Sequence, residues 1–278
     1  MIDVHIHVVP PNLPGVGSLS PLIEGPPEAV AAILRREMQA AGVTHALAMG
    51  SRSSSADDPL GVAATLRLAQ VVPGLYAVGV ADPTASTPEH LHRVEAVLRT
   101  GQVKALKGYL GYLHYGPDHP AYIPYYELAA RFDLPFVFHT GDTYSPRAKL
   151  RFAHPLLVDD VAVDHPDVRF VLAHLGNPWL TEAAEVVYKN INVWADLSGL
   201  VVGSAAGFNA EERRELIHET ARAVERAFRY AERPNRFLYG SDWPLAPMVA
   251  YRNFIRSAIP EVHHQHIFED NARALFRL

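Results

Sequence analysis

Short apolar runs alternate along this chain with longer segments of helical periodicity, and this alternation limits the fold more than any other feature. The apolar runs span residues 2–8, 44–50, 75–82, 103–110, 135–141, 169–175, 192–198 and 237–242. Helical spacing marks residues 27–40, 88–99, 120–132, 180–189, 209–231 and 262–277. Strict alternation of strands and helices predicts parallel strands, because a helical crossover returns the chain to the same end of the sheet.

Eight strand–helix units favour a closed (β/α)8 TIM barrel of the α/β class over an open, doubly wound sheet. The 278 residues fit one barrel, and no shift in composition marks a boundary, so we expect a single domain over residues 1–278. No GxGxxG follows the first strand, which removes the main support for a dinucleotide-binding fold. The loops at 111–119 and 142–153 are candidates for substrate contact.

Composition excludes several classes of partner and site. The net charge is −5, and no run of Lys or Arg could follow a phosphate backbone, so we expect no nucleic-acid partner. No apolar stretch is long enough to cross a bilayer, and Asp3, His5 and His7 interrupt the first apolar run where a signal peptide would lie. We therefore expect a cytoplasmic protein. The chain has no cysteine, so any metal must be held by nitrogen and oxygen.

The first strand carries two histidines that could chelate one cation. Two-residue alternation predicts that Asp3, His5 and His7 share one face of this strand, and that Val4, Ile6 and Val8 share the other. Two imidazoles on the same face lie a few ångströms apart, as ligands of one metal ion do.

Further polar residues follow at strand ends with a common spacing. Lys107, His139, His174 and Asp242 are separated from His7 and from one another by multiples of about 34 residues, the length of one strand, one helix and two loops. They should therefore lie at equivalent heights near the carboxyl ends of their strands, where barrel enzymes place their chemistry. A lone histidine here is usually a hydrogen-bonded core residue, but several converging polar groups need partners, and a bound cation supplies one.

The fourth strand offers two lysines, of which only one can face the barrel axis. We favour Lys107 over Lys104 because Lys107 lies closer to the carboxyl end of the strand. An ammonium group repels a metal ion, so Lys107 is a ligand only if it is carboxylated. Otherwise it binds an anionic group of the substrate.

With these motifs in place, the chain resembles the amidohydrolase superfamily, and within it the amidohydrolase-related (amidohydrolase 2) branch. The resemblance covers the whole chain. It rests on DVHIH with His5 and His7, VFHTGD with His139, LAHLGNP with His174, YGSDWP with Asp242, and the closing NARALF.

The resemblance implies a distorted barrel with a divalent metal, usually zinc, and it leaves one or two ions open. In mononuclear members such as amino-carboxymuconate-semialdehyde decarboxylase, the residues that match His5, His7, His139 and Asp242 bind the ion, and the residue that matches His174 contacts water or substrate. In binuclear members such as dihydroorotase, a carboxylated lysine on strand four bridges two ions and both later histidines are ligands. The segment LKGYLGY around Lys107 is similar to that strand-four motif.

Our leading hypothesis is metal-dependent hydrolysis of a C–N or C–O bond in a small amide, cyclic amide, ester or lactone, with Asp242 moving the proton and His174 holding a second ion or orienting the oxyanion. Arg52, Tyr109, Tyr112 and Arg147 are loop candidates for gripping the substrate.

Two other hypotheses stay open. One is a nonoxidative decarboxylase of an aromatic or unsaturated acid that uses a mononuclear metal site. The other is a non-catalytic barrel whose histidines stabilise the fold or bind a ligand. The sequence leaves the oligomeric state open, and a homo-oligomer is among the options.

Overall fold

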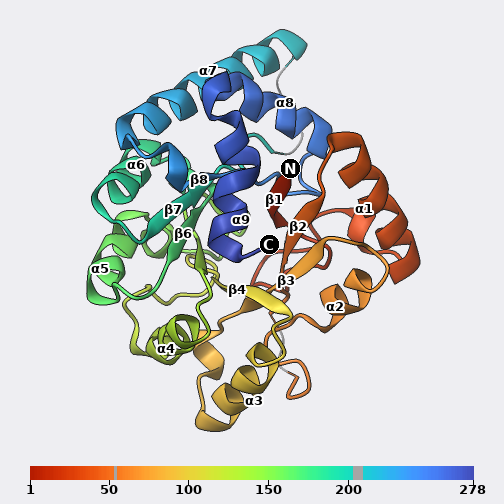
Figure 1. The fold of residues 1–278 in the computed structure, drawn as a ribbon, viewed down its shortest axis with the longest axis vertical. Helices are drawn as coiled ribbons and strands as arrows, with labels where there is room; N and C mark the ends of the chain where they lie inside the picture. The colour runs from red at the N-terminus through yellow and green to blue at the C-terminus, as the bar shows by residue number, and fades with distance from the viewer. Residues whose placement is uncertain (53–54, 203–208) are drawn as a thin grey trace.

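The computed structural model describes residues 1–52, 55–202 and 209–278. Within these residues, eight parallel strands form one sheet in chain order (Figure 1). The strands are Ile2–Ile6 (β1), His45–Met49 (β2), Leu75–Val80 (β3), Val103–Gly108 (β4), Phe136–His139 (β5), Phe170–Ala173 (β6), Val193–Asp196 (β7) and Phe237–Leu238 (β8). The predicted (β/α)8 barrel of the α/β class is confirmed.

Backbone hydrogen bonds join the two edges of this sheet. The Val4 amide donates to the Tyr239 carbonyl oxygen at 2.9 Å, and the Asp242 amide donates to the His5 carbonyl oxygen at 2.9 Å. The segment that follows β8 therefore lies against β1 and closes the barrel.

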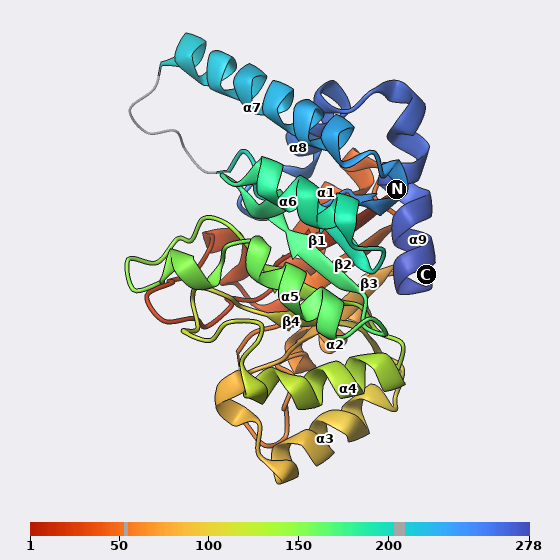
Figure 2. The same cartoon turned by 90° about the vertical axis from the view of Figure 1, so that its left-hand side faces the viewer.

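Helices surround the strands (Figures 1 and 2). They are Pro27–Ala41 (α1), Ala63–Ala69 (α2), Pro88–Leu98 (α3), Ile123–Arg131 (α4), Leu156–Asp164 (α5), Leu180–Lys189 (α6), Ala210–Ala231 (α7), Met248–Ala258 (α8) and Asn271–Phe276 (α9). Helix α1 begins with proline in its first turn and ends before Gly42, whose φ of 72° fits a left-handed helix cap. Helix α9 packs Ala272 and Leu275 against Ile2 and Leu47, so it covers the amino-terminal end of the barrel.

One prediction about strand β1 is wrong. Val4 does not share a face with Ile6 and Val8: it packs inside the barrel with Val78, whereas Ile6 and Val8 pack outward against Leu34 of α1. The pairing of β1 with β2 shifts register between Asp3 and Ile6, as in a β-bulge, and the extra residue reverses the alternation. His5 and His7 follow this shift and both line the cavity at the carboxyl end of the barrel.

Every strand ends before its apolar run does, and four of the strands also begin one residue later than the run. Strand β8 ends at Leu238, so Asp242 lies beyond it, and His174 begins a 3-10 turn after β6. Both residues have positive φ angles, 59° for Asp242 and 63° for His174, which ladder residues do not adopt. Such strained backbone is typical of residues whose side chains are aimed into a site.

None of the helices within the described ranges is both long and apolar enough to cross a membrane.

Candidate metal centre

All six residues predicted for the site line one cavity of about 530 Å³ at the carboxyl end of the barrel. They are His5, His7, Lys107, His139, His174 and Asp242. Lys107 lies in β4 and His139 ends β5, so both side chains are held by the sheet ladder. The shared position follows from the barrel itself, because the carboxyl ends of its parallel strands meet at one rim.

His5, His7 and Asp242 form one compact group of donor atoms. His7 Nε2 lies 3.4 Å from Asp242 Oδ1, and His5 Nε2 lies 3.8 Å from the same oxygen. The donor atoms of this group all lie within 4.8 Å of one another. All three side chains are buried, and Asp242 Oδ1 has no hydrogen-bond partner among the described residues.

His139 and His174 form a second pair whose protonation follows from their partners. His139 Nε2 lies 2.8 Å from the Asp142 carbonyl oxygen, so this nitrogen carries the proton and His139 Nδ1 holds a lone pair. Ser198 Oγ donates to the Asp196 carboxylate, so the Ser198 oxygen accepts from His174 Nδ1 at 2.9 Å. The remaining nitrogens, His139 Nδ1 and His174 Nε2, then face each other at 3.2 Å with two lone pairs. Such a pair needs a proton or a cation between the rings.

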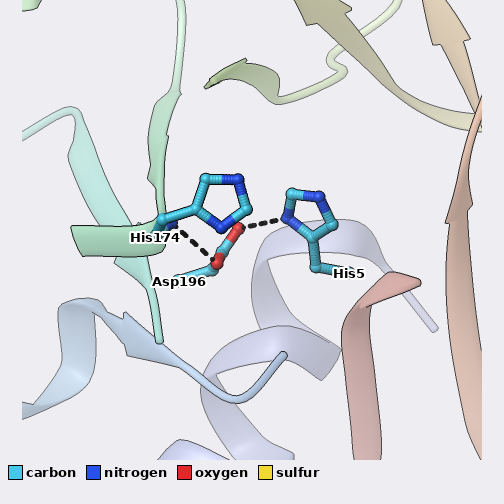
Figure 3. Close-up of side chains that lie close together, drawn as sticks. All are labelled: His5, His174 and Asp196. Carbon is cyan, nitrogen blue, oxygen red and sulfur yellow. Dashed lines mark hydrogen bonds and ion pairs between the residues drawn. The ribbon is translucent and has the colours of Figure 1, made fainter. Parts of the chain in front are cut away.

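Asp196, the last residue of β7, belongs to the site although its spacing in the sequence did not predict it. Its Oδ2 accepts from His5 Nδ1 at 2.9 Å, and its Oδ1 accepts from the His174 amide at 3.2 Å (Figure 3). The Ser198 amide and hydroxyl also donate to Oδ1. Asp196 is therefore saturated by hydrogen bonds and fixes the proton of His5 on Nδ1, which leaves Nε2 free to face Asp242 and His7.

A signal for Asp196 was present in the apolar run at 192–198, which contains this carboxylate and Ser198 near its end. The repeat of about 34 residues did not predict this position. Asp196 follows His174 by only 22 positions, because the β6–β7 connection is shorter than the average unit of the barrel.

Burial and neighbouring charges set the ionisation of the site. Burial raises the pKa of Asp242, but its contact with His7 and the nearby His174 outweigh this and hold the pKa well below its usual range. The pKa of Asp196 is also low, because the nearby His5 outweighs the effect of burial, which would raise it. Burial lowers the pKa of His139 far below the ordinary value and that of His174 to about 4, so both rings are neutral at pH 7.

Lys107 is fully buried, and its Nζ has no hydrogen-bond partner among the described residues. Burial lowers its pKa to about 8, against the opposing effect of Asp196 and Asp242. The choice of Lys107 over Lys104 agrees with the geometry, because Lys104 is only partly buried and its Nζ lies 5.5 Å from the ring of Tyr76, outside the cavity.

The loop residues divide into two groups. Tyr109 and Tyr112 line the cavity, and the hydroxyl of Tyr112 accepts from the Tyr144 amide at 3.0 Å. Arg52 and Arg147 do not contribute to the described lining. The Arg52 guanidinium instead donates to Asp82 at 2.6 Å and to Thr84 at 2.8 Å, so it ties two loops together.

The family model described as Amidohydrolase matches residues 2–278. The chain belongs to the amidohydrolase family. No curated protein resembles this amidohydrolase closely enough in sequence to be matched.

Solved structures of other proteins share the fold at low sequence identity. A probable 2-pyrone-4,6-dicarboxylic acid hydrolase from Acinetobacter baumannii, solved with citric acid, is 16% identical with a TM-score of 0.67, over 100% of this chain and 99% of that one. A zinc-bound amidohydrolase from Burkholderia multivorans is 18% identical with a TM-score of 0.68. The match covers 100% of this chain and 99% of that one. A 2,6-dihydroxybenzoate decarboxylase from Rhizobium is 14% identical with a TM-score of 0.63. The match covers 99% of this chain and 98% of that one. At these identities the likeness establishes the fold alone.

Proposed function

We propose that this protein is a metal-dependent hydrolase that cleaves a C–O or C–N bond in a small ester, lactone, amide or cyclic amide. The observation that carries the proposal is the convergence of His5, His7 and Asp242 on the floor of the cavity. Nitrogen and carboxylate donors grouped at an open cavity are typical of a catalytic metal site, whereas structural sites are closed.

The donor set fits a divalent cation. Two ligands of one tetrahedral zinc ion lie about 3.3 Å apart when each is about 2.0–2.1 Å from the metal. The 3.4 Å between His7 Nε2 and Asp242 Oδ1 agrees with that spacing. Asp242 Oδ1 is buried without a hydrogen bond among the described residues, as an oxygen reserved for a cation would be. Imidazole-rich sets suit zinc better than magnesium or calcium, so zinc is the proposed ion.

His5, His7 and Asp242 would hold the ion, with His139 and His174 as donors toward the same ion or a second one. A bound divalent cation supplies Lewis acidity, which polarises a carbonyl oxygen and lowers the pKa of water from 15.7 toward about 7. Asp242 is ionised at neutral pH because its pKa is depressed, so its carboxylate accepts the proton of the attacking water and returns it to the leaving group. His174 is neutral and lies 4.0 Å from Asp242 Oδ2, where it orients the substrate oxygen or binds the second ion.

Lys107 has one of two roles, depending on whether its side chain is a positive ammonium or a negative carbamate. As an ammonium, which predominates below its pKa of about 8, it binds a carboxylate of the substrate at the floor of the cavity. If its neutral amine adds carbon dioxide and releases a proton, the resulting carbamate would be a ligand of a second ion, for which the facing lone pairs of His139 and His174 would provide further donors.

Replacing Asp196 by Asn tests its positioning of His5. An amide can donate to His5 Nδ1 and so favour the wrong tautomer, and we expect the affinity for zinc to fall about 10- to 100-fold. Competition with a chelator of known affinity measures the change. Asp159→Asn is the matched control, because Asp159 pairs with Lys189 on the surface. Equal zinc affinities of the two variants would contradict the role of Asp196.

A decarboxylase is the alternative, and the buried cation of Lys107 beside the metal donors favours it, since this arrangement suits an aromatic or unsaturated carboxylate. The test is a panel of esters, lactones, amides and such acids, followed both by proton release and by release of carbon dioxide. We expect hydrolysis of a C–O or C–N bond without carbon dioxide. Carbon dioxide from an acid would replace our proposal by the alternative, and no turnover on any compound would support the non-catalytic barrel.

A further inference from the structure

The cavity above the metal donors has two unlike halves. Its floor carries the histidines, Lys107 and Asp242, whereas the wall formed by residues 199–202 and 245–247 together with residues of α7 and α8 is mostly apolar. The described residues of that wall include Val201, Leu216, Ile217, Leu245 and Phe254. In such a pocket the apolar wall contacts the apolar groups of a ligand, and the few polar groups of the floor fix its orientation.

The amino-terminal half of α7 directs its few apolar side chains toward the cavity. This half projects past the barrel (Figure 2) and is mostly charged, in the order AEERRELIHE over residues 210–219. Leu216 and Ile217 are its only large apolar residues, and both line the cavity together with Arg213 and Thr220 of the same face. Leu216 remains 42% exposed, so its side chain is available to a ligand.

Charge is nearly absent from this wall. Arg213 is the one charged side chain that α7 and α8 contribute to the described lining. Arg213 lies near the amino-terminal end of α7, one helical turn before Leu216 and Ile217 on the same face. The wall between Arg213 and the floor is therefore suited to alkyl or aryl groups.

We propose that the substrate carries an apolar alkyl or aryl substituent that binds against Leu216, Ile217 and Phe254 while its reacting carbonyl lies over the metal donors. This inference rests on the proposed function and specifies its substrate class. The continuity of one cavity from His5 and Asp242 to Leu216 supports it, because a single molecule can contact both halves. The volume of about 530 Å³ lies within the range of pockets that enclose such ligands.

Calorimetric binding of straight-chain carboxylates tests the inference without requiring turnover. We expect the Kd for the full-length protein to fall about two- to fourfold per added methylene from butanoate through hexanoate to octanoate, since each buried methylene contributes up to about 0.8 kcal/mol. In Leu216→Asn, and more so in the double variant with Ile217→Asn, this dependence on chain length should flatten while butanoate binding stays within about twofold.

Glu215→Gln is the matched control, because Glu215 is exposed on the other side of α7. It should keep the full dependence on chain length. Octanoate that binds no more tightly than butanoate, or no binding of any acid, would overturn the inference, and so would an unchanged dependence in the double variant. Retained dependence on chain length together with no hydrolysis of any ester, lactone or amide would instead reject the proposed function and leave the apolar site standing.

Discussion

The Asp242→Asn variant is expected to lose turnover by about 10²- to 10⁴-fold, mostly in kcat, the range typical of removing a general base. The amide keeps an oxygen at the position of Oδ1 but cannot accept a proton at neutral pH. The wild-type carboxylate can, because its low pKa keeps it ionised. Steady-state kinetics on the best ester, lactone or amide of the panel measure the loss, with metal content determined on the same samples.

Asp159→Asn is the control for this substitution as well, since it makes the same chemical change at a surface ion pair. It should leave kcat and KM unchanged. Asp242→Asn that retains more than about a third of wild-type activity would remove Asp242 from proton transfer. Loss of metal together with activity would assign Asp242 mainly to binding the ion.

The second large effect is expected for His5→Ala, which should leave the purified protein with almost no bound zinc and no measurable turnover. His5 contributes one donor of the proposed group and is also the histidine that Asp196 holds in place. Removing one of a few ligands from a site lowers metal affinity sharply, because the remaining donors cannot complete the coordination shell. Elemental analysis after dialysis against a weak chelator gives the metal content per chain.

His45→Ala provides the matched histidine control. His45 begins β2 at the opposite end of the barrel, where its ring stacks on Tyr76 at 5.9 Å. It should keep wild-type metal content. Because His5 is buried, the melting temperature of His5→Ala is compared with that of metal-free wild-type protein, and similar values would show that the variant is folded. Stoichiometric zinc in folded His5→Ala would reject His5 as a ligand.

The barrel could be predicted from the sequence because its strands are buried on both faces and read as continuous apolar runs between helical patterns. The ends of the strands could not. Residues such as His174 and Asp242 extend apolar runs in the sequence, but in the structure they leave the hydrogen-bond ladder and take positive φ angles. The bulge in β1 was equally hidden, because an extra residue in a strand changes register without changing composition.

Regular spacing predicted that His7, Lys107, His139, His174 and Asp242 share one rim of the barrel, and all five line the cavity, since equal repeats carry equivalent positions to the same rim. It failed for Asp196, which follows an unusually short connection. Nor could spacing distinguish the roles of neighbouring residues in the site. His5 and His7 read alike in DVHIH, yet His5 Nδ1 is bound by the buried Asp196 carboxylate, whereas His7 Nδ1 has no hydrogen-bond partner among the residues that the structure describes. Such distinctions depend on side-chain partners that are far apart in the chain.

Anomalous X-ray diffraction at the zinc edge, from crystals of the zinc-loaded protein, tests the central claim most directly. The account predicts a strong peak about 2.0–2.2 Å from His5 Nε2, His7 Nε2 and Asp242 Oδ1. A further peak between His139 and His174 would add a second ion to that account. Anomalous density that lies only elsewhere in the protein, or no peak at the His5, His7 and Asp242 group, would contradict it.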